Sequence, residues 1–288
     1  MKELLRKTFE LIRDNPVLWA LYLVAELLAI GLWHLRGIAE KSIFRWFSAS
    51  HSVLGGGVPA PTDQAFAKAT LADIPLGLAT IFVIICLFVV VLLVTAGMVN
   101  AIMREQEPDA RKTLVGLTHD WRGILLFSLK FLLAIGVVGV AVTVPLLYLL
   151  RAAHHPEYLT SHLWLPVILI LYMGSLGWLM MPSAIRLQRP KMAGPISTQV
   201  RSWGMILAIA ASEVGYALEI LSQKLEKGMI LEFRWEWTAL SMLNSILANA
   251  PDVLLFVALA LLASESAAKS QLQSDSLAAQ QPPDPITE

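Results

Sequence analysis

The side chains in this sequence that are best placed to do chemistry are ionisable groups inside long apolar stretches. Glu26, Glu213 and Asp252 each interrupt a run of apolar residues, and Lys130 lies within another. A charged side chain near the centre of a membrane-spanning helix costs about 2.5–3.5 kcal/mol on insertion scales, so such residues usually have a function. These four residues are therefore the first candidates for a functional site.

Three of them are predicted to lie at a similar depth in a membrane. Counted from the start of their helices, Glu26, Lys130 and Glu213 are about 11–15 Å deep at a rise of 1.5 Å per residue. A lysine between two carboxylates would suit a coupling site for a proton or another cation, with Asp252 as a further candidate. The alternative is a structural ion pair and a lysine whose amine reaches back to the interface. Depth leaves both interpretations open, because it does not determine which helix faces meet.

Histidines form a second group of candidates. The segment HHPEYLTSH contains His154, His155 and His162, and imidazole is a common ligand of zinc and copper. Their spacing does not match an H-x-x-x-H pair on one helix, and Pro156 interrupts the segment. Solvated histidines in a loop are the favoured interpretation, and metal binding is the less favoured one.

The sequence lacks the local signatures of common enzymes. It contains no G-x-S-x-G, no G-x-x-x-x-G-K-[ST] and no H-E-x-x-H motif. Its single cysteine, Cys86, excludes an internal disulfide. We therefore expect no catalytic residue, no cofactor and a protein that is not an enzyme.

Composition indicates what kind of element positions the ionisable residues. Hydrophobic residues make up 56% of the 288 positions and charged residues only 15%, against roughly 45–50% and about 25% in soluble domains. The 22 basic and 22 acidic residues cancel, which excludes the basic face that nucleic-acid binding needs. The expected partner is a lipid bilayer.

Six apolar stretches approach the length of about 20 residues that crosses a bilayer. The clearest two, Ile74–Met103 and Leu163–Ile185, contain no charged residue over 30 and 23 positions. The others carry one or two charges each, so four or five spans is the alternative count. The six predicted spans lie near residues 16–33, 75–103, 123–150, 163–185, 205–221 and 240–263.

The order of these spans predicts an all-α, polytopic transmembrane helical bundle over residues 1–264. We expect three helical hairpins in a parallel repeat, each preceded by a short cytoplasmic segment. These segments are residues 2–15, 109–121 and 194–203. From residue 265 to residue 288 the chain is too polar to form a core, and we expect a disordered cytoplasmic tail.

Two local patterns refine this picture. In the first cytoplasmic segment Leu4, Leu5, Phe9 and Ile12 share one helical face, which indicates a helix at the membrane interface or one packed under the bundle. In the fifth span, small residues four positions apart predict close packing against a neighbouring helix. They are Ala208 with Ser212 and Ala211 with Gly215.

Basic residues predict the orientation. With six spans, 13 Lys and Arg residues fall on the side of the two termini and eight on the other, with Lys130 inside a span. Because cytoplasmic loops carry the excess of basic residues, we expect both termini in the cytoplasm and a prokaryotic inner membrane. Trp235 and Trp237 would anchor the external end of a span at the interface.

Three polar segments resemble a group of prokaryotic six-helix integral membrane proteins. They are RKTFELIRDNPVLW, REQEPDARKTLVGL and SAIRLQRP. The group includes uncharacterised families and the membrane domain attached to some glycerophosphodiester phosphodiesterases. In those phosphodiesterases the chemistry belongs to a separate soluble domain, so the resemblance implies a fold and no catalytic residue.

The sequence thus favours a membrane scaffold or accessory subunit whose cytoplasmic helices or tail contact a protein partner. One alternative is a small ion-coupled transporter that uses Glu26, Lys130 and Glu213. A membrane enzyme is a third, and it would need reactive groups that converge at one depth.

Overall fold

The structure, a computed structural model, describes residues 2–49, 63–117, 121–152, 164–189, 196–227 and 234–280. These residues form nine helices and no strand, which confirms the predicted all-α fold. The helices are α1 (Lys2–Asp14), α2 (Val17–Ala49), α3 (Asp63–Met103), α4 (Ala110–Leu117), α5 (Trp121–Ala152), α6 (Trp164–Gln188), α7 (Thr198–Lys227), α8 (Arg234–Asn249) and α9 (Pro251–Gln280).

Six segments of the described chain are long and apolar enough to cross a membrane, as the sequence predicts. They are Val17–Ile43, Thr70–Met103, Trp121–Leu146, Pro166–Gln188, Thr198–Ser222 and Met242–Ser266. This length and composition are those of a multi-pass membrane protein. The first segment runs to Ile43 rather than to residue 33, because polar residues such as Glu40 and Lys41 are good helix formers and continue the helix.

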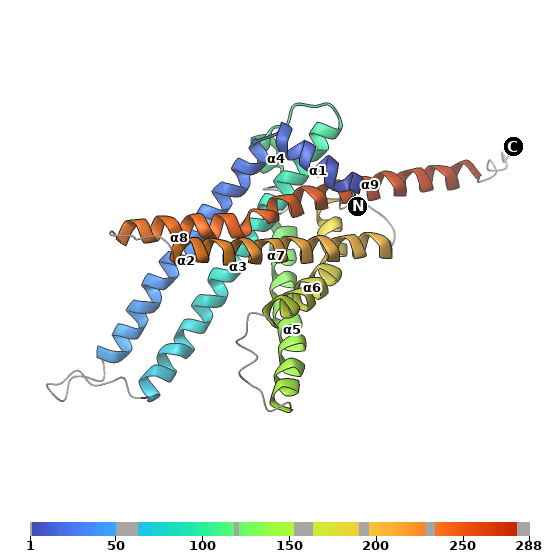
Figure 1. Ribbon diagram of the computed structural model, residues 1–288. Coiled ribbons are helices and arrows are strands. Elements are labelled where there is room, and N and C mark those ends of the chain that lie inside the picture. Colours follow the sequence, from blue (N-terminus) through green and yellow to red (C-terminus); the bar gives the residue numbers. More distant parts are fainter. Residues whose placement is uncertain are drawn as a thin grey trace.

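The sixth span is not the continuous helix that the sequence predicts over residues 240–263. α8 ends at Asn249, Ala250 forms a turn, and α9 begins at Pro251. Proline suits the first position of a helix because it lacks an amide hydrogen, and it disfavours helical backbone at the preceding residue. The span therefore consists of two successive helices (Figure 1), with Asp252 in the first turn of the second.

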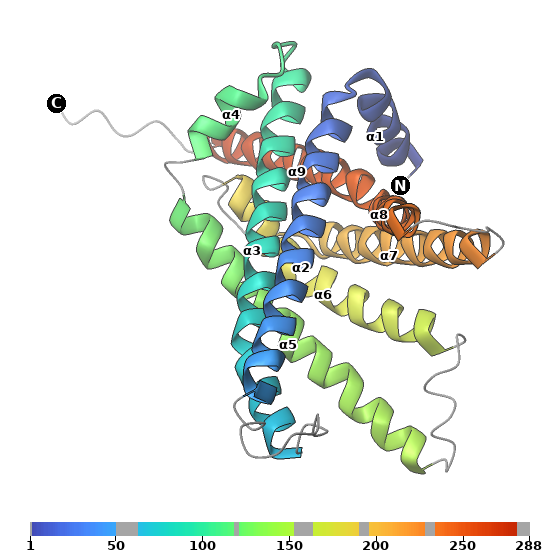
Figure 2. The same cartoon turned by 90° about the vertical axis from the view of Figure 1, so that its left-hand side faces the viewer.

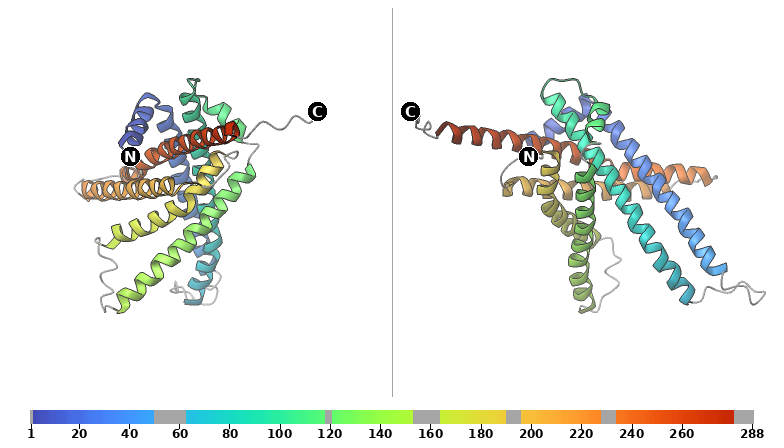
Figure 3. Two further views of the ribbon diagram at one scale, coloured as in Figure 1. Left: turned by 90° about the vertical axis from the view of Figure 1, so that its right-hand side faces the viewer. Right: turned by 180° about the vertical axis from the view of Figure 1, so that it is seen from behind.

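α3 is the central helix of the bundle. It packs against α2, α5 and α9, and its residues Met98 and Val99 are fully buried. α2 and α3 lie side by side in all views, while α7, α8 and α9 run across them (Figures 1 and 3). α6 lies between α5 and α7 (Figure 2). Each predicted hairpin is thus a pair of packed helices, the last being α7 with the interrupted α8–α9 span.

The small residues of α7 mark its contacts, as predicted. A Cβ atom built on Gly177 of α6 would lie only 3.0 Å from the Cβ of Ala208, so these two helices need both small side chains. Gly215 faces the backbone of Ala248 in α8 in a similar way. Both α7 residues are buried.

The first two of the three segments predicted to be cytoplasmic form separate helices and the third does not. α1 packs against α9 and contributes Leu4 and Ile12 to the core, which selects the packed alternative, although Phe9 on α1 stays exposed. α1 and α4 lie at the same end of the bundle (Figure 2). In the third segment the chain joins α7 directly at Thr198, because its polar residues continue the spanning helix without a break.

The predicted disorder from residue 265 is wrong for the part of the tail that the structure describes. α9 continues as a helix to Gln280 and projects from the bundle (Figure 1). The segment is rich in Ala, Leu and Gln, which favour helix, and it extends a helix that is already formed. Residues 281–288 lie outside the described residues.

An ion pair connects α2 and α3 near the end of their hairpin. Nη2 of Arg36 lies 2.5 Å from Oδ2 of Asp73 and 3.8 Å from Oε2 of Glu40. The Arg36 guanidinium also lies over the Trp33 ring, 4.9 Å from its centroid. The side chains of Arg36 and Asp73 are 19% and 15% exposed, so water screens this pair less than a surface pair.

We expect Arg36→Ala to lower the free energy of unfolding by about 1–2 kcal/mol, between the values of exposed and buried ion pairs. SDS-induced unfolding in mixed micelles measures this change. Arg13→Ala is the matched control, because Arg13 pairs with Asp14 at the surface, where the two side chains are 75% and 58% exposed. That control should leave stability unchanged, and equal losses for both variants would contradict the role of the Arg36 pair.

Candidate functional site

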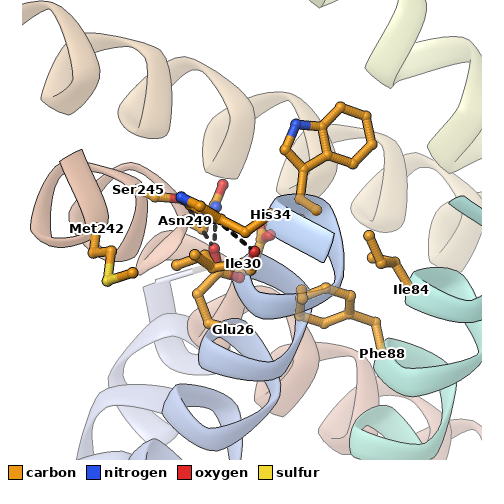
Figure 4. A pocket seen from close by; sticks show the side chains of 11 residues that line it. Glu26, Ile30, His34, Ile84, Phe88, Met242, Ser245 and Asn249 are labelled. Atoms are coloured by element: carbon orange, nitrogen blue, oxygen red, sulfur yellow. Dashed lines mark hydrogen bonds between the residues drawn. The ribbon is translucent and has the colours of Figure 1, made fainter. Parts of the chain in front are cut away.

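A cavity of about 350 Å³ lies among α2, α3, α8 and α9. It is called the polar cavity below, because carboxylate, amide and hydroxyl groups of α2, α8 and α9 line it. Figure 4 shows these side chains around the cavity, with Phe88 and Ile84 of α3 on one side. The lining residues are Glu26, Ala29, Ile30, Trp33, His34, Ile84, Phe88, Met242, Ser245, Asn249 and Asp252.

Glu26 is the most buried charged residue of the polar cavity, with 4% of its surface exposed. Its Oε1 atom accepts a hydrogen bond from Nδ2 of Asn249 at 2.7 Å and another from Oγ of Ser245 at 3.2 Å (Figure 4). Ser245 and Asn249 are four residues apart on α8 and therefore share one helical face. The two donors fix the orientation of the carboxylate.

Tyr22 connects this carboxylate to the break in the sixth span. It precedes Glu26 by four residues, so both side chains lie on the same face of α2. The Tyr22 hydroxyl donates a hydrogen bond to the backbone carbonyl of Asn249 at 2.7 Å and lies 3.5 Å from Oδ2 of Asp252. The carbonyl of Asn249 is at the end of α8, where the helix itself supplies no donor. The Tyr22 hydroxyl therefore satisfies a backbone group that would otherwise lack a partner.

Three aromatic rings pack beside these polar groups. The Tyr22 ring centroid lies 5.9 Å from that of Phe88 and 6.0 Å from that of Phe256, and the last two are 6.3 Å apart. Rings at these distances and tilted to one another attract. The cluster holds α2, α3 and α9 together directly next to Glu26 and Asp252.

The electrostatics of the polar cavity favour a positively charged occupant. Glu26 and Asp252 both line it, and none of the described lining residues is Lys or Arg. Two carboxylates in a region of low dielectric constant lose hydration and repel each other when no cation compensates them. The N-terminus of α9 offsets this in part, because the helix dipole favours a negative charge in its first turn. A cation or a proton in the cavity would supply the rest.

His34 is an exposed member of the lining. Its Nδ1 atom lies 3.0 Å from the carbonyl oxygen of Ile30, one turn earlier on α2. Among the described residues, no group of three or more His, Cys, Asp or Glu side chains has the geometry of a metal site.

The four ionisable residues that the sequence singles out do not all line one cavity. Glu26 and Asp252 line the same cavity. Lys130 is exposed on α5, with no ion-pair partner within the described part of the chain. Glu213 is half-buried on α7, and its Oε1 atom has no hydrogen-bond partner among the described residues. The predicted equal depth does not by itself bring side chains together, because residues at one depth on different helices can face opposite directions.

Some predicted residues cannot be placed in this way. His154, His155 and His162 lie outside the described residues. Trp235 and Trp237 are positions in α8, and their side chains lie outside those described.

Sequence reasoning missed Tyr22, Ser245 and Asn249, which orient the two carboxylates. One signal was available: Pro251 followed by Asp252 inside an apolar run is typical of a helix start. That pattern predicts that one helix ends and another begins at this point. It does not predict that the Tyr22 hydroxyl, more than 200 positions away, donates a hydrogen bond to the carbonyl of Asn249 at the end of α8.

A second polar cluster connects α3, the end of α6 and α9. Arg189 donates hydrogen bonds to the Asn100 side chain and, at 3.0 Å, to Oγ of Ser264. Ser264 in turn donates to Oδ1 of Asn100 at 2.7 Å. Burial, together with the nearby positive charge of Arg104, lowers the pKa of Arg189. Its side chain joins three helices, and we interpret this cluster as structural.

In comparisons with known proteins, no family model matches this chain, and no curated protein or solved structure matches it either. The resemblance to six-helix membrane families therefore stays a prediction.

Proposed function

We propose that this protein is an ion-coupled membrane transporter whose cation-binding site is the polar cavity between Glu26 and Asp252. The observation that carries the proposal is the position of these two carboxylates. They come from helices far apart in the sequence and line one cavity inside an apolar bundle, without a Lys or Arg among the described lining residues. Buried carboxylates of this kind favour the binding of a cation or a proton.

The broken sixth span supports the proposal independently. Non-helical backbone within a membrane is tolerated where it is buried in protein or lines a cavity. Transporters often build substrate and ion sites from such interrupted helices, at whose ends backbone groups and dipoles are free to interact. Here the break at Ala250 lies between two lining residues of the polar cavity, Asn249 and Asp252.

The proposed setting follows from the charge distribution. We propose an inner membrane of a prokaryote with both termini in the cytoplasm, because Lys and Arg are more numerous on the side of the termini. The function that we propose in this setting is the binding and translocation of an ion, not a chemical reaction.

The test is ion flux in liposomes that contain the purified full chain. We expect saturable uptake of radioactive Na⁺ or of protons, the latter followed with an internal pH-sensitive dye. Glu26→Gln should lower the apparent affinity for the transported ion about tenfold or more, because a neutral amide replaces a charged ligand. Gln retains an oxygen that accepts hydrogen bonds from Ser245 and Asn249, so the variant should fold.

Lys130→Gln is the control, since Lys130 is exposed and does not line the polar cavity. It should transport like the unaltered protein. Flux no greater than in protein-free liposomes, or equal flux by the Glu26→Gln variant, would overturn the proposal. Loss of transport in Lys130→Gln would instead favour the layer of Glu26, Lys130 and Glu213.

A scaffold or accessory role is the second candidate, and one observation favours it. α9 projects beyond the bundle as a helix to Gln280, where it is available to a protein partner (Figure 1). Mild solubilisation followed by mass spectrometry should then recover a stoichiometric partner. Repeated recovery of the protein alone would count against this role.

A further inference from the structure

A second cavity adjoins the polar cavity at Asp252. It has a volume of about 290 Å³ and lies among α3, α5, α6, α7 and α9. The two cavities share three lining residues, Ile84, Phe88 and Asp252. They are therefore neighbouring compartments on either side of the same carboxylate and the same aromatic ring.

The second cavity is apolar except at this junction. Among its described lining residues Asp252 is the sole ionisable one, and the others are mainly aliphatic, aromatic and methionine side chains. It is called the apolar cavity below. Phenylalanines such as Phe127 and Phe131 supply apolar ring surface, and methionines such as Met173 and Met180 adapt to ligands of different shape.

We infer that the two cavities form one binding site for a lipophilic organic cation, a substituted ammonium whose charge lies at Asp252 and Glu26 and whose apolar part fills the apolar cavity. This inference rests on the proposed function and names the class of substrate. Charge complementarity selects the cation, because both carboxylates lie at one end of the joined site. The joined volume falls in the range of about 300–1,000 Å³ that is typical of small-molecule sites.

Binding of small amines to the full chain in lipid nanodiscs tests the inference. Three probes separate charge from apolar bulk: methylammonium, n-hexylammonium and the neutral 1-hexanol. Each buried methylene strengthens binding by about fourfold, so hexylammonium should bind at least about tenfold more tightly than methylammonium even if its chain is partly buried. Hexanol should show no saturable binding, because it lacks the charge that the carboxylates recognise.

Two variants test which cavity residues bind the charged part of the ligand and which bind its apolar part. Asp252→Asn should weaken hexylammonium binding about tenfold or more, since it removes the carboxylate between the cavities. Leu259→Phe, which fills part of the apolar cavity, should bring hexylammonium affinity down toward that of methylammonium. Leu133→Phe makes the same change at an exposed position of α5 and should have no effect.

The outcomes distinguish this inference from the proposed function. Equal binding of hexylammonium and hexanol, or hexylammonium binding that Asp252→Asn does not change, would mean partition into lipid and would overturn the inference. A hexylammonium affinity no higher than that of methylammonium would also overturn the inference. In either case, ion flux that depends on Glu26 would leave the proposed function intact. Absence of that flux would overturn the proposed function itself.

Discussion

Replacing Tyr22 with Ala is expected to lower the free energy of unfolding by about 3–5 kcal/mol, the usual cost of truncating a buried aromatic side chain. Tyr22 is 3% exposed, and its ring packs against both Phe88 and Phe256. Its removal would leave a cavity between α2, α3 and α9 that neighbouring side chains cannot close. SDS-induced unfolding in mixed micelles measures the loss.

Tyr22→Phe separates the hydroxyl from the ring. We expect this variant to cost about 1–3 kcal/mol, because the carbonyl of Asn249 then loses its donor in a buried place. Trp19→Ala is the control for loss of an aromatic side chain from α2, since Trp19 is 41% exposed and lipid can fill its place. If Trp19→Ala were as destabilising as Tyr22→Ala, the proposed importance of the aromatic cluster and the capped carbonyl would be wrong.

The second large effect is expected for Gly215→Leu, which should destabilise the protein by about 3 kcal/mol through overpacking. Any Cβ atom on Gly215 would overlap the backbone carbonyl oxygen of Ala248, so α7 and α8 would have to move apart. A backbone atom cannot rotate away as a flexible side chain can. Because Asn249 follows Ala248 directly, the displacement would also move a donor of Glu26 and weaken ion binding.

Gly31→Leu is the matched control for this substitution. A Cβ atom on Gly31 meets nothing within 4 Å, and the residue is exposed on α2. Leu has a higher helix propensity than Gly, so this variant should be as stable as the unaltered protein or more stable. Gly215→Leu should therefore lower the SDS unfolding midpoint, whereas Gly31→Leu should leave it unchanged or raise it. Shifts of the same sign and size would contradict the close contact between α7 and α8.

The prediction from sequence was good for properties that depend on one segment alone. The run from Ile74 to Met103 has no charge, and it became the most apolar of the six spans. The helix over residues 2–14 followed from its spacing of leucine and isoleucine. The prediction was wrong for the described part of the tail, because its structure depends on more than its own composition. Its polar composition predicted disorder, whereas attachment to the preceding helix lets the helix continue to Gln280.

The candidate site was predicted in part. Glu26 and Asp252 stood out because a carboxylate in an apolar run is anomalous by itself. Lys130 stood out for the same reason, yet it is exposed on α5, because residue type and depth do not determine the direction of a side chain around its helix. Asn249 and Ser245 gave no signal, since amides and hydroxyls are common in helices and become informative once a partner is known.

By itself the sequence determined that this is an all-α protein with six apolar spans, because hydrophobic length and helical periodicity are local properties. Only the tertiary structure decided which charges meet. It brought Glu26 to Asp252 at the break after Asn249 and left Lys130 apart, because contacts between helices depend on the rotation and order of all of them. The sequence marked the carboxylates as candidates, and the packing of α2, α3, α8 and α9 brought two of them to one cavity.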